Sequence, residues 1–289
     1  MQIDVLGTLD VRENGASVTP TAPKPRQVLA LLALHADQVV PVSALIDELW
    51  AGRPPRSART TLQTYVLQLR DLIARALEKE TPAAGPAALL RRRVKDVLVT
   101  LPGGYMLASG GGSSDVREFE RLAGMGYRAL DAGDFQGASR LLREALALWT
   151  GPAFADVQTG AQLEMEARRL EESRLCALDQ RIEADLRLGR HRELLAELTV
   201  LTSRYRTHEN LHAQFMLALH RSGRRGEALD IYHRLRSTLV RDLGLEPSAR
   251  LRRLQQSILK AAPEAPLTED RQPPVTAPSP RESGICPPG

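Results

Sequence analysis

One five-residue pattern in the chain could bind a metal ion. His208, Glu209 and His212 follow the H-E-x-x-H spacing, in which two imidazoles one helical turn apart bind zinc and the glutamate activates a water molecule. The metzincin class of zinc peptidases also needs a glycine and a third histidine, and this chain has Phe215 and Ala218 at those positions. Because the pattern also lies within a helical repeat, we predict no metal site, no cofactor and no enzyme activity. A zinc metallopeptidase is kept as an alternative.

A second group of residues could bind double-stranded DNA. Between residues 57 and 77 the apolar side chains recur every three or four positions, which predicts a long helix with one buried face. The opposite face carries hydroxyl and amide groups, and arginines lie at its start and beside it. Such groups hydrogen bond to base edges and phosphates, although a solvated face without a ligand is the alternative. The candidate DNA-binding residues on and before this helix are Arg56, Arg59, Thr60, Thr61, Gln63, Thr64, Gln68 and Arg70.

A basic run and a hairpin follow this helix. Residues 97–100 and 105–107 are strand-like and flank a Leu-Pro-Gly-Gly turn, which predicts a β-hairpin. The cations before the hairpin could neutralise DNA phosphates, and the tyrosine after its turn could contact the backbone. These candidates are Arg91, Arg92, Arg93, Lys95 and Tyr105.

Strands and helices must position these residues. Residues 1–11 alternate between apolar and polar, Asn14-Gly15 predicts a tight turn, and residues 17–19 can form a returning strand. Helices are expected over residues 26–35, 43–50 and 57–77, the second of them capped by Ser43. Strands, three helices and a hairpin in this order are typical of a winged helix, whose third helix enters the major groove.

The second half of the chain contains a repeat. Gly133, Gly189 and Gly223 are each followed at the same three spacings by residues that share one helix face. The last two glycines are 34 residues apart, which is the tetratricopeptide period, and the first pair is 56 apart. We expect each glycine to end one helix and begin the turn into its partner. Stacked helix pairs of this kind form a curved binding surface.

The composition of the chain excludes several classes of protein. The chain has 289 residues, a net charge of +4 and two cysteines. No apolar run is long enough to span a membrane, and a disulfide scaffold is excluded. Since the net charge is small, any DNA-binding surface must be a local patch. The predicted organisation is an α+β winged helix-turn-helix domain at 1–108, a glycine-rich flexible hinge at 109–114, an all-α tetratricopeptide-like domain at 115–260 and a disordered Pro-rich tail at 261–289.

Several segments, in order, resemble one family of regulators. The chain is similar to Streptomyces antibiotic regulatory proteins, which pair a response-regulator-type winged helix with a helical bacterial transcriptional activation domain. The resemblance runs from residue 1 to about residue 260. The matching segments are residues 25–32, 62–70, 102–105, 147–157 and 242–247.

This resemblance implies a transcriptional activator. It implies binding to direct repeats near the −35 region of promoters and recruitment of RNA polymerase to secondary-metabolite (antibiotic) biosynthesis genes. Monomers would pair on tandem sites about one helical turn apart. The loop after the second helix would face the polymerase holoenzyme, including its sigma factor, and its candidate contact residues are Trp50, Gly52, Arg53 and Pro54.

The implied location is the cytoplasm, in association with the nucleoid and without membrane contact. A tetratricopeptide scaffold that binds proteins and lacks specific DNA binding is the second alternative, beside the zinc metallopeptidase. Absence of sequence-specific DNA binding would favour the scaffold.

Overall fold

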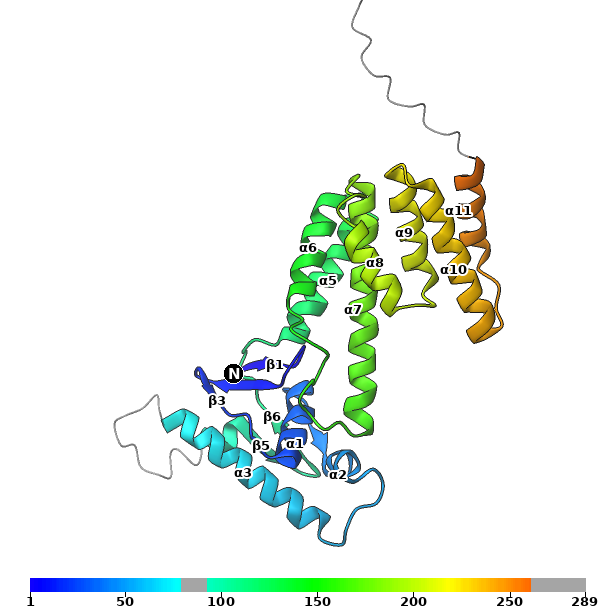
Figure 1. The fold of residues 1–289 in the computed structure, drawn as a ribbon. Helices are drawn as coiled ribbons and strands as arrows, with labels where there is room; N and C mark the ends of the chain where they lie inside the picture. Colours follow the sequence, from blue (N-terminus) through cyan, green and yellow to red (C-terminus); the bar gives the residue numbers. More distant parts are fainter. Residues whose placement is uncertain (79–92, 261–289) are drawn as a thin grey trace, which may run out of the picture.

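The computed structural model describes residues 1–78 and 93–260. In Figure 1 a part made of small sheets and three helices lies at one end, and a stack of helices extends away from it. The α+β winged-helix part followed by an all-helical part is confirmed as the fold class. The predicted tail lies outside the described residues. No helix within the described ranges combines the length and the apolar composition that a membrane span needs.

The N-terminal sheet is antiparallel, in the order β1-β2-β3. Asn14 and Gly15 have φ values of 50° and 76° and form the predicted tight turn between β2 and β3. The apolar residues of the predicted alternation are buried, but no continuous strand forms over residues 1–11. Between β1 and β2 the carbonyls of Val5, Leu6 and Gly7 accept bonds from the amides of residues 150–155 instead of from a strand. The strands are β1 (Gln2–Asp4), β2 (Asp10–Glu13) and β3 (Ala16–Ser17).

Three helices and a second sheet complete the winged-helix part. The helices are α1 (Pro23–Leu34), α2 (Val42–Trp50) and α3 (Ala58–Glu78). The sheet has the order β4-β6-β5, with β4 (Val40–Pro41), β5 (Leu98–Leu101) and β6 (Gly104–Leu107). The hairpin β5–β6 is the predicted one, and β4 is an additional strand that pattern did not indicate.

The expected cap of α2 is wrong. The helix begins one residue earlier, after Pro41, and no side chain caps it. The amide of Val42 instead donates to the carbonyl of Gly103 at 2.9 Å, so the tip of the β5–β6 hairpin accepts a bond from the first turn of α2. Gly103 has a φ of 83°, which glycine adopts without strain.

The helical part contains seven helices among the described residues. The three aligned glycines, Gly133, Gly189 and Gly223, have φ values of 78–79° and each follows the end of a helix, as predicted. The helices are α5 (Asp115–Asp131), α6 (Phe135–Ala147), α7 (Ala161–Arg187), α8 (Leu195–Arg204), α9 (Glu209–Arg221), α10 (Arg225–Leu243) and α11 (Ala249–Lys260).

The apolar core divides into two clusters. The first joins the winged-helix part to α5, α6 and α7 as far as Ala177. The second begins at Ile182 on the same helix and continues to Ile258 on α11. Helix α7 therefore contributes to both clusters, and in Figure 1 it runs from α2 at its start to α8 near its end.

The segment expected to be a flexible hinge is held by hydrogen bonds. The amide and hydroxyl of Ser109 donate to the carboxylate of Asp37 at 2.7 and 2.6 Å. These bonds hold the pKa of Asp37 below its ordinary value. The amide of Ile3 donates to the carbonyl of Ser113 at 3.0 Å. A Cβ at Gly112 would collide with the backbone of Met1, so this glycine allows a close approach of two chain segments.

Candidate DNA-binding surface

Helix α3 has one buried and one exposed face, as its periodicity predicts. The buried face carries Leu62, Val66 and Leu69 among others, each 1–2% exposed. Thr61 is half-buried at the edge between the two faces. Leu67, 58% exposed, is an apolar side chain within the exposed face and can contact a thymine methyl group. The predicted residues that lie exposed on or just before this helix are Arg56, Arg59, Thr60, Gln63, Thr64 and Gln68.

Two of the candidate residues hold the hairpin in place. The guanidinium of Arg70 donates to the carbonyl of Leu98 and to the hydroxyl of Thr100, both at 2.8 Å, and so joins α3 to β5. Tyr105 is only 8% exposed and packs in the first core cluster. Because these side chains are used inside the fold, we assign them to positioning the hairpin and leave Tyr105 out of the DNA surface proposed below.

The basic run is described only in part. Arg91 and Arg92 lie outside the described residues. Arg93 and Lys95 are exposed in a helical turn that directly precedes β5, and Val94 between them is buried. Neither cation forms an ion pair within the part of the chain that the structure describes, so both charges are free to meet a phosphate.

The loop between α2 and α3 stands out from the core. Ala51 and Gly52 have φ values of 48° and 75°, which turn the chain sharply at the end of α2. The ammonium of Lys24 donates to the carbonyl of Leu49 at 2.8 Å and satisfies one free carbonyl at that end. Residues 51–57 are exposed, and Trp50 is half-buried against the first core cluster. The predicted polymerase contact residues therefore form an accessible loop with one packed anchor.

A buried glutamate on α2 joins this region to α7. The carboxylate of Glu48, which is 3% exposed, accepts bonds from the amides of Gly160, Gln162 and Leu163 at 2.5, 2.8 and 3.2 Å. These are free amides at the N-terminus of α7, where a negative charge is favoured. Gln27 on α1 also donates to this carboxylate, at 3.1 Å.

Two more carboxylates bond to the N-terminal segment. Asp115, at the start of α5, accepts bonds from the amides of Val5 and Leu6 at 2.6 and 2.7 Å. Burial raises the pKa of Asp115 to about 6, although the two amides act to lower it. Asp156 accepts from the amide of Leu9 at 2.8 Å and forms an ion pair with Arg26. Pattern reasoning missed all three carboxylates, because each accepts a bond from a backbone amide more than 100 positions away.

The H-E-x-x-H residues take part in local structure. His208 lies before the first turn of α9, and its Nδ1 accepts a bond from the amide of Leu211 at 3.3 Å. Glu209 accepts from the amide of Ser248 at 2.9 Å. His212 is 7% exposed, and burial lowers its pKa. No group of three metal-binding side chains occurs within residues 1–78 and 93–260.

Comparison with protein families agrees with this architecture. Residues 16–82 match the family "Transcriptional regulatory protein, C terminal", and residues 114–259 match "Bacterial transcriptional activator domain". The chain is 56% identical over 263 residues to the regulatory protein DnrI of Streptomyces peucetius, covering 91% of this chain and 93% of DnrI. This chain belongs to the Streptomyces antibiotic regulatory protein family.

More distant members of this family are longer than the present chain. The regulatory protein AfsR of Streptomyces coelicolor is 35% identical over 91% of this chain, which covers 24% of AfsR. A solved structure of Mycobacterium tuberculosis EmbR, in complex with a low-affinity phosphopeptide, has a TM-score of 0.78 and 33% identity and covers 89% of this chain and 64% of that one. These relatives are transcriptional regulators and not enzymes.

Proposed function

We propose that the protein is a sequence-specific activator that binds promoter direct repeats near the −35 region and recruits RNA polymerase to secondary-metabolite genes. The observation that carries the proposal is the exposed face of α3, which presents Gln63, Thr64 and Gln68 away from a fully packed opposite face. Amides and hydroxyls in this register are the groups that read base edges in the major groove. The family to which the chain belongs supports the same role.

The hairpin and its preceding turn supply the backbone contacts in this proposal. Arg70 fixes β5 against α3, so the exposed Arg93 and Lys95 are held at a set distance from the reading face. Contacts to phosphates contribute affinity without sequence preference and are weakened by salt. Two copies bound to tandem half-sites one turn of DNA apart would present the same face to the promoter.

The loop at residues 51–56 is the proposed contact with the polymerase holoenzyme, including its sigma factor. The loop is exposed and connects α2 to α3, so it stays accessible when α3 occupies the major groove. Arg53 and Pro54 are at its centre. Replacing Arg53 with alanine is expected to leave DNA affinity unchanged and to lower activated transcription in a reconstituted reaction.

Binding experiments with defined DNA test the reading residues. Selection from a random duplex pool with the wild-type protein gives the preferred site, and Thr64→Ala and Gln68→Ala are then expected to lower affinity for that site by about tenfold without changing non-specific binding. Arg93→Ala is expected to weaken binding to every sequence and to reduce the salt slope by about one. The matched control is Gln256→Ala, an exposed amide on α11.

Two outcomes would contradict the proposal at different levels. If all three variants bind as the wild type does, the assignment of residues is wrong. If selection enriches no sequence, the protein is a tetratricopeptide-like scaffold whose winged helix docks on another protein.

A further inference from the structure

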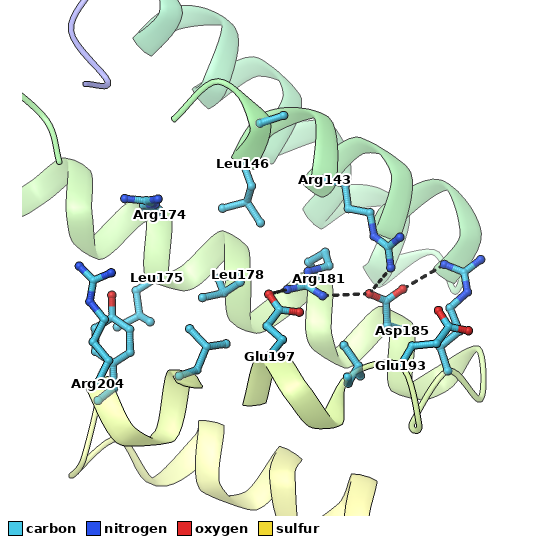
Figure 2. Close-up of a pocket in the computed structure, with 15 residues that line it drawn as sticks. Arg143, Leu146, Arg174, Leu175, Leu178, Arg181, Asp185, Glu193, Glu197 and Arg204 are labelled. Carbon is cyan, nitrogen blue, oxygen red and sulfur yellow. Dashed lines mark hydrogen bonds and ion pairs between the residues drawn. The ribbon is translucent and has the colours of Figure 1, made fainter. Parts of the chain in front are cut away.

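A groove of about 630 Å³ lies between α6, α7 and α8, far from α3 (Figure 1). Its volume is within the range of small-molecule sites, about 300 to 1,000 Å³. Five arginines and three carboxylates line it, which leaves two positive charges in excess. In Figure 2, Leu146 and Leu178 lie between two arginines, Arg174 and Arg204, on one side and Asp185 on the other.

The charges at one end of the groove neutralise each other. Asp185 is fully buried, and its carboxylate accepts bonds from Arg143 at 2.7 Å, Arg190 at 3.1 Å and Arg181 at 3.2 Å. Arg181 also pairs with Glu197. Dashed lines in Figure 2 mark this network. Its arginines have their carboxylate partners already and are poorly placed to bind another anion.

The opposite end has two arginines without such a network. Arg204 stacks on the ring of Tyr205, 5.4 Å from its centroid, and forms no hydrogen bond or ion pair within the described residues. Arg174 stacks on Trp149 at 4.7 Å, and its two polar contacts are long, at 3.4 Å to the carbonyl of Gly151 and 3.7 Å to Glu171. Both side chains lie toward the end of the groove away from Asp185 in Figure 2.

The middle of the groove is apolar. Leu146 on α6 and Leu175 and Leu178 on α7 line it, and each is half-buried. Partly exposed leucines between two charged ends lose their contact with water when an apolar ligand covers them, which favours binding. The groove thus has an apolar centre and a cationic end at which Arg204 has no carboxylate partner among the described residues and Arg174 has only a long one.

We propose that this groove binds a small organic anion with an aromatic or aliphatic body, whose carboxylate or other acidic group meets Arg174 and Arg204 while the body covers the leucines. Guanidinium groups held by ring stacking are pre-oriented to donate two bonds to such an acid. A cation is disfavoured by the excess of arginine. A neutral apolar molecule would leave Arg204 without a partner and Arg174 with only its long contacts to Glu171 and Gly151.

Two fluorescent dyes test the cationic end and the apolar centre of the groove separately. Anilinonaphthalene sulfonate carries an acidic group on an apolar body, and phenylnaphthylamine has a similar body without the charge. We expect saturable binding of one sulfonate dye per chain, and about tenfold weaker binding to the double variant Arg174→Gln, Arg204→Gln. The affinity of the same double variant for phenylnaphthylamine is expected to change by less than about twofold, since this dye makes no charged contact.

Control variants distinguish the groove from the rest of the surface. Arg168→Gln removes an exposed arginine of the same helix that does not line the groove, and it is expected to bind both dyes as the wild type does. Leu178→Trp fills the apolar centre and is expected to weaken the binding of both dyes. Arg204→Gln alone keeps the test valid if Arg174 proves necessary for packing of Trp149, because Arg204 is exposed.

Three results would overturn the proposal. The first is binding of the sulfonate dye that does not saturate at one molecule per chain. The second is an equal loss of affinity for both dyes in the double arginine variant. The third is an affinity for the sulfonate dye that Leu178→Trp leaves unchanged. The experiment uses the full chain, with circular dichroism as the check that each variant is folded.

Discussion

Two places in the molecule can be compared as junctions: the interface between the winged-helix part and the first helices after it, and the boundary between the two apolar clusters within α7. The sequence suggests a break at the first and none at the second, whereas the packing is continuous at the first and divided at the second. Residues 109–114 are small and glycine-rich, yet one apolar cluster extends across them from the winged helix into α5, α6 and α7. The middle of α7 has no break in its helix, yet the first cluster ends at Ala177 and the second begins at Ile182. Chain composition therefore marks where the backbone turns, and side-chain packing decides which residues share a core.

The two junctions also use carboxylates differently. At the first, Glu48, Asp115 and Asp156 accept bonds from backbone amides of distant segments. At the second, Asp185 accepts bonds from three arginine side chains. The bonds to amides hold the backbone of one segment against that of another. The bonds to arginines form a polar network where the first apolar cluster ends and the second begins.

The largest effect is expected at the second junction, from Asp185→Ala. The change removes the buried acceptor that three arginines share and leaves Arg181, which is 6% exposed, with Glu197 as its remaining carboxylate partner. Loss of one member of a buried ion pair costs about 3–5 kcal/mol. Burial raises the pKa of Asp185, but bonds from Arg143 and Ser139 outweigh it and hold the pKa below its ordinary value. The carboxylate therefore stabilises the fold at neutral pH, and this contribution is lost on acidification.

Two probes in one urea titration locate this effect. The two tryptophans, Trp50 and Trp149, both pack with the first cluster, so their fluorescence reports that cluster, and circular dichroism reports all helices. Asp185→Ala is expected to move the helical transition to lower urea more than the fluorescence transition. Glu193→Ala, an exposed carboxylate beside the same groove, is the control. Equal shifts of both transitions would show that the clusters unfold as one.

A smaller effect is expected at the first junction, from Glu48→Ala. Buried amides at the start of α7 lose their acceptor, and the free energy of unfolding is expected to fall by about 2–3 kcal/mol. Here the fluorescence transition should move at least as far as the helical one. Asp47→Ala, an exposed neighbour on α2, should stay within about 0.5 kcal/mol of wild type. A shift confined to the helical signal would contradict a shared core at this junction.

The smallest effect is a pH dependence due to Asp115. Its pKa of about 6 in the folded protein exceeds the ordinary value, so the folded state binds more protons between about pH 4 and 6. The free energy of unfolding should therefore fall by up to about 2 kcal/mol as pH rises through this window. Urea titrations at several pH values should show a flatter profile for Asp115→Asn. Asp131→Asn, an exposed acid on α5, should keep the wild-type profile, and an unchanged profile in Asp115→Asn would exclude this residue as the cause.

Local pattern was sufficient for the elements that carry the candidate surface. The apolar period located the buried face of α3, and the Pro-Gly-Gly turn located the β5–β6 hairpin. The spacing of Gly133, Gly189 and Gly223 located three helix ends. Each of these features is set by residues within one or two helical turns, which is the range over which periodicity and turn chemistry act.

Contacts between distant segments were not predictable from pattern. Glu48 and Asp115 look like ordinary acids of helical segments, and only their partners 109 to 115 positions away explain their burial. The position of Tyr105 after the hairpin turn predicts a contact with DNA, whereas its strand directs the side chain into the core. The strand β4 has two residues, too few for an alternating pattern, and pairing with β6 creates it.

The bond between Glu48 and α7 limits how regulators of this kind can be recombined. A chimaera that takes its DNA-binding half from one relative and its activation half from another keeps this contact only if the first supplies the acid and the second a glycine at the matching position. At Gly160 a Cβ would collide with the carbonyl oxygen of Glu48. Compatible parents would thus be recognised by this pair of positions, which lie 112 residues apart in the chain.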